Sequence, residues 1–300
     1  TGNKVVIGCS ARHHGAAQNA QNPQGIVKAF SYNSTLKKWE TMGSDIKGAE
    51  PGDAFGSSVS MDDTGNIVVV GSMGSSGERR DKQGAGRVDV YKYTSTGWTQ
   101  LGQTIYGNNT GDGCGFEVAI NGDGSRIAIG SYSEDKNIQY DENAGKVRVY
   151  SYNSTSKSWV QLGSTIEGEY WRGLVSGSFL SFNSTGDVLA IGQARVGKTN
   201  SDGVPTGQST AGANVFALQG GDWVKRGSSI MPLPNNSNSY CTNAMRVSLN
   251  SAGTRVAIGD WSGMEYNSGF VRVYNYSNGS WGLIGTLNTD NVDPGFGYSL

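Results

Sequence analysis

The most informative segment for the fold is AFGSSVSMDDTGNIVVVGS, at residues 54–72. Residues 56–61 show the alternation of a β-strand, and the Asp-Asp-Thr-Gly segment after them is typical of a tight turn. Residues 67–71 then form a continuous β-branched run, which is the pattern of a strand buried on both faces. The segment therefore predicts an antiparallel β-hairpin.

Two further strands are expected after this hairpin. The segment GRVDVY at residues 86–91 alternates again, and after a short turn the segment WTQLG at 98–102 gives an outermost strand. Four consecutive antiparallel strands cannot cover both of their own faces. We therefore expect several such sheets to pack against one another.

The same unit recurs through the chain. In each unit a Trp is followed four residues later by a Gly, and the Trp residues lie about 60 residues apart, which is the self-similarity of a repeat protein. The five Trp residues are Trp39, Trp98, Trp159, Trp223 and Trp281. Small residues stand in the inner strand of each unit, where several sheets would crowd around one axis. These residues are Gly56, Gly115, Gly177, Ala244 and Gly297.

These features predict one all-β domain over residues 1–300, a five-bladed β-propeller of four-stranded antiparallel blades. The ring is expected to close through its two ends. Residues 295–300 form an inner strand without partners, and residues 3–8 form a second strand without its inner one, so their pairing would complete one blade and remove the exposed edges. The alternative is that these residues are part of a six- or seven-bladed ring.

Two segments of the second unit, residues 52–60 and 64–72, resemble the FG-GAP repeat of integrin-α-type propellers. With residues 98–102 added, they are similar to the tandem propeller repeats of extracellular proteins in algae, other microbial eukaryotes and marine bacteria. The resemblance implies an extracellular or cell-surface protein that works in adhesion or assembly without catalysis. Integrin-like repeats often bind calcium in the first hairpin. The corresponding turns here carry only one or two carboxylates, so no metal site is expected.

The composition argues against several classes of protein. The formal net charge of -1 gives no electrostatic footprint for nucleic acid, and no apolar run is long enough to suggest a membrane helix. No cofactor is expected, since residues 192–199 end like a phosphate loop but no helix pattern follows them.

Asn-x-Ser/Thr sequons are glycan acceptors in secreted proteins. They begin at Asn33, Asn108, Asn153, Asn183, Asn235, Asn275 and Asn278.

The loops divide into two sets. Those within the first hairpin are nearly constant in length, whereas those between the second and third strands differ from unit to unit and share one face with the loops between blades. Binding residues are usually built into the variable loops of a constant scaffold. Aromatic and Arg residues there are enriched at protein interfaces, and aromatic rings also stack on sugars. The candidates are Tyr170, Trp171, Arg172, Trp261 and Tyr266. The alternative is that they pack against their own loops.

We expect from this a non-catalytic structural or adhesive protein, not an enzyme, whose variable loops bind an extracellular protein or a second copy. The alternative is a lectin-like protein that binds glycans. A glycoside hydrolase is the less favoured third hypothesis, because it needs two nearby carboxylates. The acids that offer them are Glu117 in an inner strand and Asp53, Asp112, Glu169 and Asp293 in loops.

The chain has three cysteines, too few for a disulfide scaffold. The repeat places Cys9 and Cys241 in neighbouring blades of a five-bladed ring. A Cys9–Cys241 disulfide is therefore a candidate in an oxidising compartment, and three unpaired thiols are the alternative.

Overall fold

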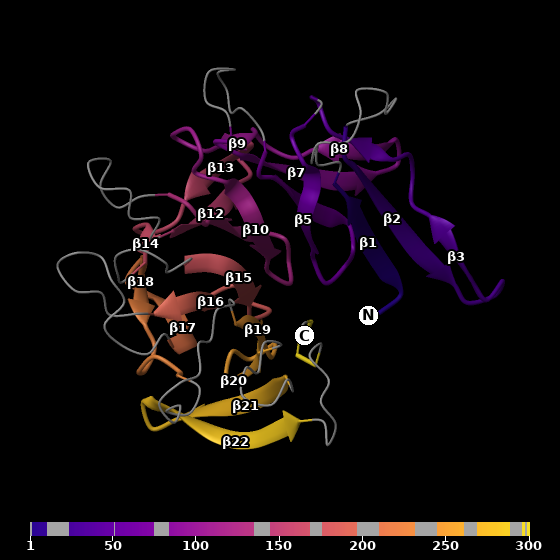
Figure 1. Cartoon of the computed structure of the whole chain (residues 1–300). Helices are drawn as coiled ribbons and strands as arrows, with labels where there is room; N and C mark the ends of the chain where they lie inside the picture. Colours follow the sequence, from indigo (N-terminus) through magenta and orange to yellow (C-terminus); the bar gives the residue numbers. More distant parts are fainter. Residues whose placement is uncertain are drawn as a thin grey trace, which may run out of the picture. The chain divides into compact units, whose positions relative to one another are not determined.

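The computed structural model describes residues 2–10, 24–50, 52–74, 84–134, 145–168, 176–196, 210–231, 245–260, 269–288, 296–297 and 299–300. Within these ranges the chain forms five antiparallel sheets, each from strands that are consecutive in the sequence (Figure 1). No helix occurs in the described ranges, and none of them supplies a helix that could cross a membrane. The prediction of an all-β protein is confirmed.

The second and third sheets show the complete sequence repeat. The second sheet has the order β5 (Phe55–Met61), β6 (Ile67–Ser72), β7 (Arg87–Thr94), β8 (Gly97–Gln100), with the short β9 (Ile105–Tyr106) paired to β7. The third sheet has the order β10 (Cys114–Ile120), β11 (Arg126–Ser131), β12 (Lys146–Asn153), β13 (Ser158–Gln161), with β14 (Ile166–Glu167) paired to β12.

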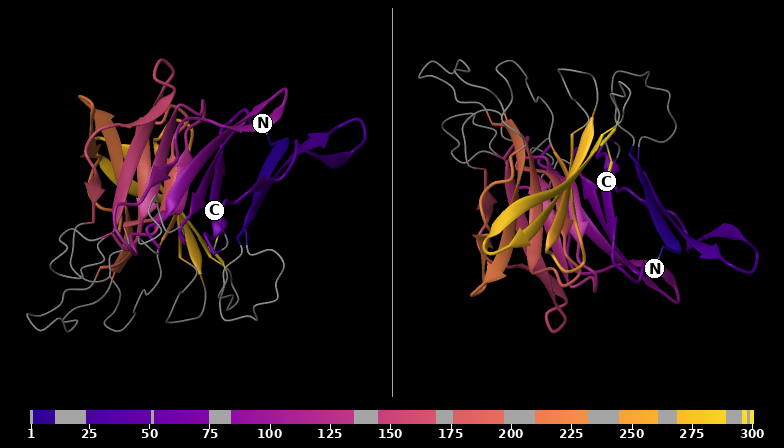
Figure 2. Two further views of the ribbon diagram at one scale, coloured as in Figure 1. Left: turned by 90° about the horizontal axis from the view of Figure 1, so that it is seen from above. Right: turned by 90° about the horizontal axis from the view of Figure 1, so that it is seen from below.

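The fourth sheet has the order β15 (Ser176–Phe182), β16 (Val188–Val196), β17 (Thr210–Gln219), β18 (Asp222–Lys225). The fifth has the order β19 (Arg246–Leu249), β20 (Arg255–Asp260), β21 (Phe270–Ser277), β22 (Ser280–Asn288), and its last hairpin is visibly twisted (Figure 2). These four sheets confirm the predicted path of four antiparallel strands.

The first sheet departs from this path. It contains β1 (Lys4–Cys9), β2 (Ile26–Asn33) and β3 (Lys38–Thr41), with the short β4 (Ile46–Lys47) paired to β2. By their place in the repeat, β1, β2 and β3 are the second, third and outer strands of the unit. Among the described residues no inner strand pairs with β1.

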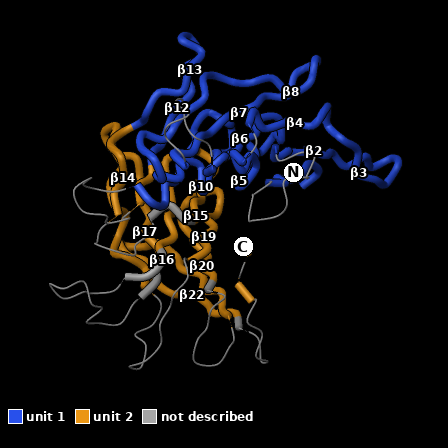
Figure 3. The backbone as a smooth tube through the Cα atoms, turned by 45° about the horizontal axis from the view of Figure 1, so that its top comes forward, with its two compact units in different colours: residues 1–134, 148–162 blue, residues 135–147, 163–300 orange. Residues whose placement is uncertain are grey.

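Two compact units divide the chain (Figure 3). Unit 1 comprises residues 1–134 and 148–162, and unit 2 comprises residues 135–147 and 163–300. Unit 1 thus holds the first two sheets and most of the third, and unit 2 holds the fourth and fifth.

The β-branched run of β6 is buried on both faces, as the sequence predicts. Val68 and Val70 pack with Phe55 in one apolar cluster, whereas Val69 packs with Ile127 in another. All three valines are fully buried. Because successive side chains of a strand point to opposite faces, β6 contributes to the core on either side of its sheet. A third apolar cluster fills unit 2.

Neighbouring sheets approach each other most closely at glycines. A Cβ atom added to Gly71 would lie 2.1 Å from the carbonyl oxygen of Gly115 in the next sheet, and one added to Gly8 would lie 2.2 Å from that of Gly56. In unit 2, Gly259 stands in the same relation to Gly297, at 2.5 Å. These contacts explain why the second strand needs glycine at this step.

The repeated Trp and Gly are the two halves of one contact between neighbouring sheets. Trp98 donates its indole Nε1–H to the carbonyl oxygen of Met42 at 2.7 Å, and its ring covers Gly43. Trp159 donates its indole Nε1–H to the carbonyl oxygen of Leu101 at 2.8 Å, and its ring covers Gly102. We call this contact the Trp latch. Trp281 forms it in unit 2 with Arg226, at 2.7 Å, over Gly227, and Trp223 covers Gly163.

The tight turns of the first hairpins use side chains as backbone caps. The carboxylate of Asp62 accepts the backbone N–H groups of Asn66 and Ile67 at 2.8 and 2.7 Å. Asn121 and Asn250 hold the corresponding turns through their amide oxygens. This is the turn chemistry expected of Asx residues.

Candidate functional site

The binding residues predicted from the variable loops, Tyr170, Trp171, Arg172, Trp261 and Tyr266, lie outside the described residues, and so does Cys241. Cys9 ends β1 with an exposed side chain. Their roles therefore stay predictions. The described residues direct attention to buried polar groups at the same end of the second and third sheets, where the inner strand begins and the second strand ends.

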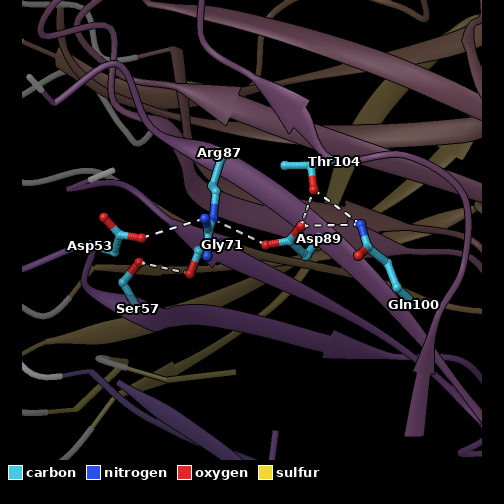
Figure 4. A network of polar contacts seen from close by, with 7 residues as sticks. All are labelled: Asp53, Ser57, Gly71, Arg87, Asp89, Gln100 and Thr104. Atoms are coloured by element: carbon cyan, nitrogen blue, oxygen red, sulfur yellow. Dashed lines mark hydrogen bonds and ion pairs between the residues drawn. The ribbon is translucent and has the colours of Figure 1, made fainter. Parts of the chain in front are cut away.

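In the second sheet these groups form a chain of contacts around Arg87 (Figure 4). The Arg87 guanidinium lies 3.5 Å from the carboxylate of Asp53 and 3.1 Å from that of Asp89. Thr104 donates a 2.6 Å hydrogen bond to Asp89, and Gln100 donates to Thr104 at 3.0 Å. The distances to Arg87 are those of ion pairs, and the Arg87 Nε–H has no aligned hydrogen-bond acceptor among the described residues.

Burial dominates the electrostatics of this cluster. Burial raises the pKa of Asp53, although the charge of Arg87 opposes the shift. Burial also raises the pKa of Tyr91, with a further contribution from the charge of Asp89. Each acidic side chain here has an ionic or hydrogen-bonding neighbour, so the contacts of this cluster link residues within the second sheet.

The third sheet builds a different cluster at the same place in the repeat. Arg148 occupies the position of Asp89 and forms a bidentate pair with Glu134, one bond of which measures 2.6 Å. Glu134 is 3% exposed. Burial disfavours the charge of Arg148, but the hydrogen bonds and charge of Glu134 outweigh it and raise its pKa. The guanidinium is therefore held charged and fixed in place.

A small cavity of about 130 Å³ opens beside Arg148. We call it the third-sheet pocket. Its lining is mostly polar, and its residues come from β9, the loop after it, and β10 to β13. They are Tyr106, Asn108, Cys114, Ile129, Arg148, Tyr150 and Gln161. The volume corresponds to about four water molecules in the liquid, so it suits a small molecule or a part of a larger one.

Burial keeps two titratable groups of this lining neutral. Burial raises the pKa of the Cys114 thiol to about 12, so it is a thiol and a poor nucleophile. Burial likewise raises the pKa of the Tyr150 phenol. The pocket thus offers phenol, amide and guanidinium hydrogen-bonding groups, and the Arg148 charge is already neutralised by Glu134. This set matches a neutral molecule that carries hydroxyl or amide groups.

A larger groove of about 620 Å³ lies between β4 with the loop before it in the first sheet and β7 and β8 in the second. Its aromatic wall includes Tyr93 and Trp98, whose rings pack together with centroids 5.1 Å apart. Trp98 is committed to its latch with Met42. We therefore place the candidate site in the third-sheet pocket, because its lining is mostly polar and comes from several strands of one sheet.

The loop acids considered for hydrolysis have structural contacts. The Asp112 carboxylate accepts the backbone N–H groups of Asn108 and Asn109 at 3.1 and 2.7 Å and so closes the loop before β10. Asp53 faces Arg87, as described above. Glu117 lies half-buried in β10, while Glu169 and Asp293 are outside the described residues. No sequence signal marks the pocket itself, because its lining comes from six separate segments.

The sequons occupy varied surroundings. Asn108, Asn153 and Asn278 are exposed, whereas Asn33 and Asn275 are half-buried. Asn183 is 4% exposed and donates to Thr185 and Asp187. Asn235 lies outside the described ranges.

Comparison with known proteins gives no family. No protein-family model and no curated protein sequence matches the chain. Solved structures do match in arrangement. A candidate 6-phosphogluconolactonase from Bacteroides uniformis is 12% identical, with a TM-score of 0.47 over 96% of this chain and 84% of its own. The periplasmic gluconolactonase of Pseudomonas aeruginosa is 12% identical, with a TM-score of 0.44 over 95% and 83%.

A third match is a hypothetical selenium-binding protein from Sulfolobus tokodaii. It is 10% identical, with a TM-score of 0.48 over 95% of this chain and 64% of its own. At such identities and TM-scores the likeness concerns the general arrangement of the strands, which is propeller-like. The comparisons identify no FG-GAP family.

The expectation of a non-catalytic adhesive protein is corrected here. It rested on an analogy of fold, and structures with a similar arrangement of strands include proteins named as lactonases. These comparisons contradict the expectation of a non-enzyme, which had no support beyond that analogy.

Proposed function

We propose that this chain binds a small neutral molecule with hydroxyl or amide groups in the third-sheet pocket. The observation that supports this most directly is that Asn108, Tyr150, Gln161 and Arg148 line one small polar pocket. A concave pocket with a few polar lining groups is suited to a hydrogen-bonding occupant. The fixed Arg148–Glu134 pair supplies directional N–H groups without a net charge that would demand an anion.

Binding is tested with neutral probes of graded size, namely glycerol, erythritol and gluconolactone, by calorimetry and by chemical-shift changes. Gln161→Leu should weaken binding at least tenfold, because it removes one converging amide. Gln100→Leu is the matched control, since Gln100 has the same place in the second sheet and should leave binding unchanged. Acid release from gluconolactone, followed at constant pH, shows whether bound lactone is also hydrolysed. If no probe binds to the wild type, the proposal is wrong.

We further propose that the chain forms a five-bladed ring closed by its two ends. The support is the position of Gly297, whose carbonyl oxygen stands against Gly259 as that of Gly56 stands against Gly8. Residue 297 thus occupies the place of an inner strand beside the fifth sheet, and β1 is the strand that lacks one. By the repeat register of β5 with β6, Leu300 would lie opposite Ile7.

Closure is tested by oxidising the double variant Ile7→Cys with Leu300→Cys. A disulfide between these positions in a monomer, located by peptide mapping, supports the ring. Reaction only between different molecules, or a low-resolution envelope with six or more blades, would contradict it. Ile7→Cys with Gly282→Cys serves as the control pair, because the proposed ring gives no pairing between these positions.

A further inference from the structure

In the third sheet, a glutamine side chain caps the free edge of the outer strand β13. The Nε2–H of Gln103 donates to the carbonyl oxygen of Trp159 at 2.8 Å, and the backbone N–H of Trp159 donates to the Oε1 of Gln103 at 2.8 Å. One primary carboxamide thus satisfies both backbone groups of Trp159. These groups would otherwise lie open at a sheet edge.

The same two groups of Trp98 face the free edge of β8 in the second sheet. Leu101 donates its backbone N–H to Val90 at 2.7 Å, and in an antiparallel pair only every second residue bonds to the partner strand. Trp98 precedes Leu101 by three residues, so its N–H and carbonyl oxygen point away from β7.

The residue that corresponds to Gln103 is Ser44, since each directly follows a latch glycine. A serine side chain is too short to span to the neighbouring outer strand as glutamine does. The Ser44 side chain is exposed, and it forms no hydrogen bond with another described residue. The second sheet therefore lacks the cap that the third sheet has.

The fourth sheet caps its Trp in another way. Asp222, directly before Trp223, accepts the backbone N–H of Trp223 at 2.8 Å. Gly97 stands directly before Trp98 and has no side chain to offer. Within the described ranges, neither kind of cap reaches the backbone of Trp98.

The groove of about 620 Å³ described above lies at this edge, and we call it the β4–β8 groove. Figure 3 shows β4 and β8 side by side in unit 1. Its lining combines the rings of Tyr93 and Trp98 with small hydroxyl side chains. Of its two charged lining residues, Asp45 pairs with Lys28 at 3.2 Å and Lys47 is exposed. The volume is that of a ligand site and exceeds one side chain.

From this comparison we propose that the β4–β8 groove binds a glutamine side chain on a peptide segment of a partner protein. The carboxamide oxygen would accept the backbone N–H of Trp98, and its NH₂ group would donate to the Trp98 carbonyl oxygen, as Gln103 does at Trp159. A primary carboxamide presents an oxygen and an N–H on the same side. A trans peptide bond presents them on opposite sides and cannot make this pair.

The proposal is independent of the third-sheet pocket, because the groove and the pocket share no lining residue. Binding of neutral probes to that pocket can therefore fail or succeed without affecting the outcome here.

Binding is tested on the full chain with the blocked peptide acetyl-Gly-Gln-Gly-N-methylamide. Nuclear magnetic resonance should show a saturable shift of the Trp98 backbone amide. Peptides with Glu or Met in place of Gln should bind about tenfold more weakly, because each leaves one backbone group of Trp98 or both without a partner. Equal binding of the Met peptide would indicate backbone pairing along β8, and tighter binding of the Glu peptide would indicate an anion site at Lys47. Either result, or no saturable shift at Trp98, would overturn the proposal.

Two exchanged variants test the comparison itself. Ser44→Gln places a carboxamide where Gln103 lies in the next sheet, so it should abolish peptide binding and slow hydrogen exchange of the Trp98 amide to about the rate at Trp159. Gln103→Ser should open the corresponding place, so the Gln peptide should then shift the Trp159 amide as well.

Thr99→Gln is the matched control. It adds a glutamine at an exposed position of β8 that does not line the groove, and it should leave peptide binding unchanged. Ser44 is exposed, so Ser44→Gln decides the proposal even if Gln103→Ser lowers the stability of the fold. Unchanged peptide binding by Ser44→Gln would overturn the proposal.

Discussion

Asp112 shows at the scale of one residue how burial competes with hydrogen bonding. Burial raises its pKa above the usual 3.8, although two backbone N–H groups stabilise the charged form. The folded protein therefore holds this proton to higher pH than the unfolded chain does. Stability from this group is present at low pH and is lost as the pH rises from about the usual carboxyl value through the raised pKa.

We predict that Asp112→Asn makes the unfolding free energy fall less steeply as the pH rises above the usual carboxyl pKa, since an amide oxygen can still accept both N–H groups. Urea denaturation across this range measures the slope. Asp123→Asn is a control for which the opposite pH dependence of stability is expected. Burial raises the pKa of Asp123, but hydrogen bonds from Ser125 and Asn121 outweigh this and lower it, so its substitution should cost stability at neutral pH and little in acid. Identical pH profiles for wild type and Asp112→Asn would contradict the prediction.

The sequons give a second prediction at this scale. If the protein is extracellular, as its resemblance to secreted repeat proteins suggests, we expect glycans on the exposed Asn153 and Asn278 and none on Asn183. The Asn183 amide is buried, and its Nδ2 already donates to two side chains. Expression through a eukaryotic secretory pathway, followed by glycopeptide mass spectrometry, checks this. Modification of folded protein at Asn183 would mean that its turn opens.

At the scale of elements, the Trp latch fixes how one sheet meets the next. A Cβ atom on Gly102 would lie 2.7 Å from the Trp159 ring, whereas one on Gly97 would meet nothing within 4 Å. Both glycines have positive φ, at 79° and 107°. Substitution by Ala therefore imposes backbone strain at both positions but overpacking at Gly102 alone.

We predict that Gly102→Ala destabilises the protein by about 1–3 kcal/mol more than Gly97→Ala, the usual cost of overpacking a well-packed site. Urea denaturation at one pH measures the difference. The near-ultraviolet circular dichroism of Gly102→Ala should also change, because the Trp159 ring must move. Equal costs at the two positions would show that the latch yields without strain.

At the scale of the whole molecule, the proposed pairing of the two chain ends depends on the edge of β1 that does not pair with β2. Val5 and Ile7 are 40% and 47% exposed on this strand, and only β2 pairs with it in the described residues. In the proposed closed ring, the edge of β1 opposite β2 would bond to residues 296–300. Edge strands with free N–H groups otherwise tend to pair between molecules.

We predict that the β1 amides that do not bond to β2 exchange with solvent as slowly as those of β6. Deleting residues 296–300 should raise their exchange rates by at least a hundredfold and leave β6 unchanged. Hydrogen exchange measured by mass spectrometry or nuclear magnetic resonance gives both rates. Fast exchange in the intact chain would contradict closure.

The repeat and most of the strands could be predicted from the sequence. Local spacing sets these features: the β-branched run of β6 must be buried on both faces, and the Asx-Gly turns must reverse the chain. The two-residue strands β4, β9 and β14 could not be predicted, since two residues carry no periodicity. The Trp and Gly markers were evident, but their pairing was not. The packing of the sheets showed that the Trp of one sheet covers the Gly of the sheet before it.

The third-sheet pocket depends on tertiary contacts. Arg148 and Asp89 share one place in the repeat, yet Asp89 joins a closed ionic chain and Arg148 lines a cavity. The difference arises from Glu134, which lies in a loop before β12 and pairs with Arg148. Such a contact depends on side chains distant in sequence meeting in a buried space, where the low dielectric makes each polar partner energetically decisive. Strand periodicity depends on adjacent residues only, and it can therefore be predicted from the sequence.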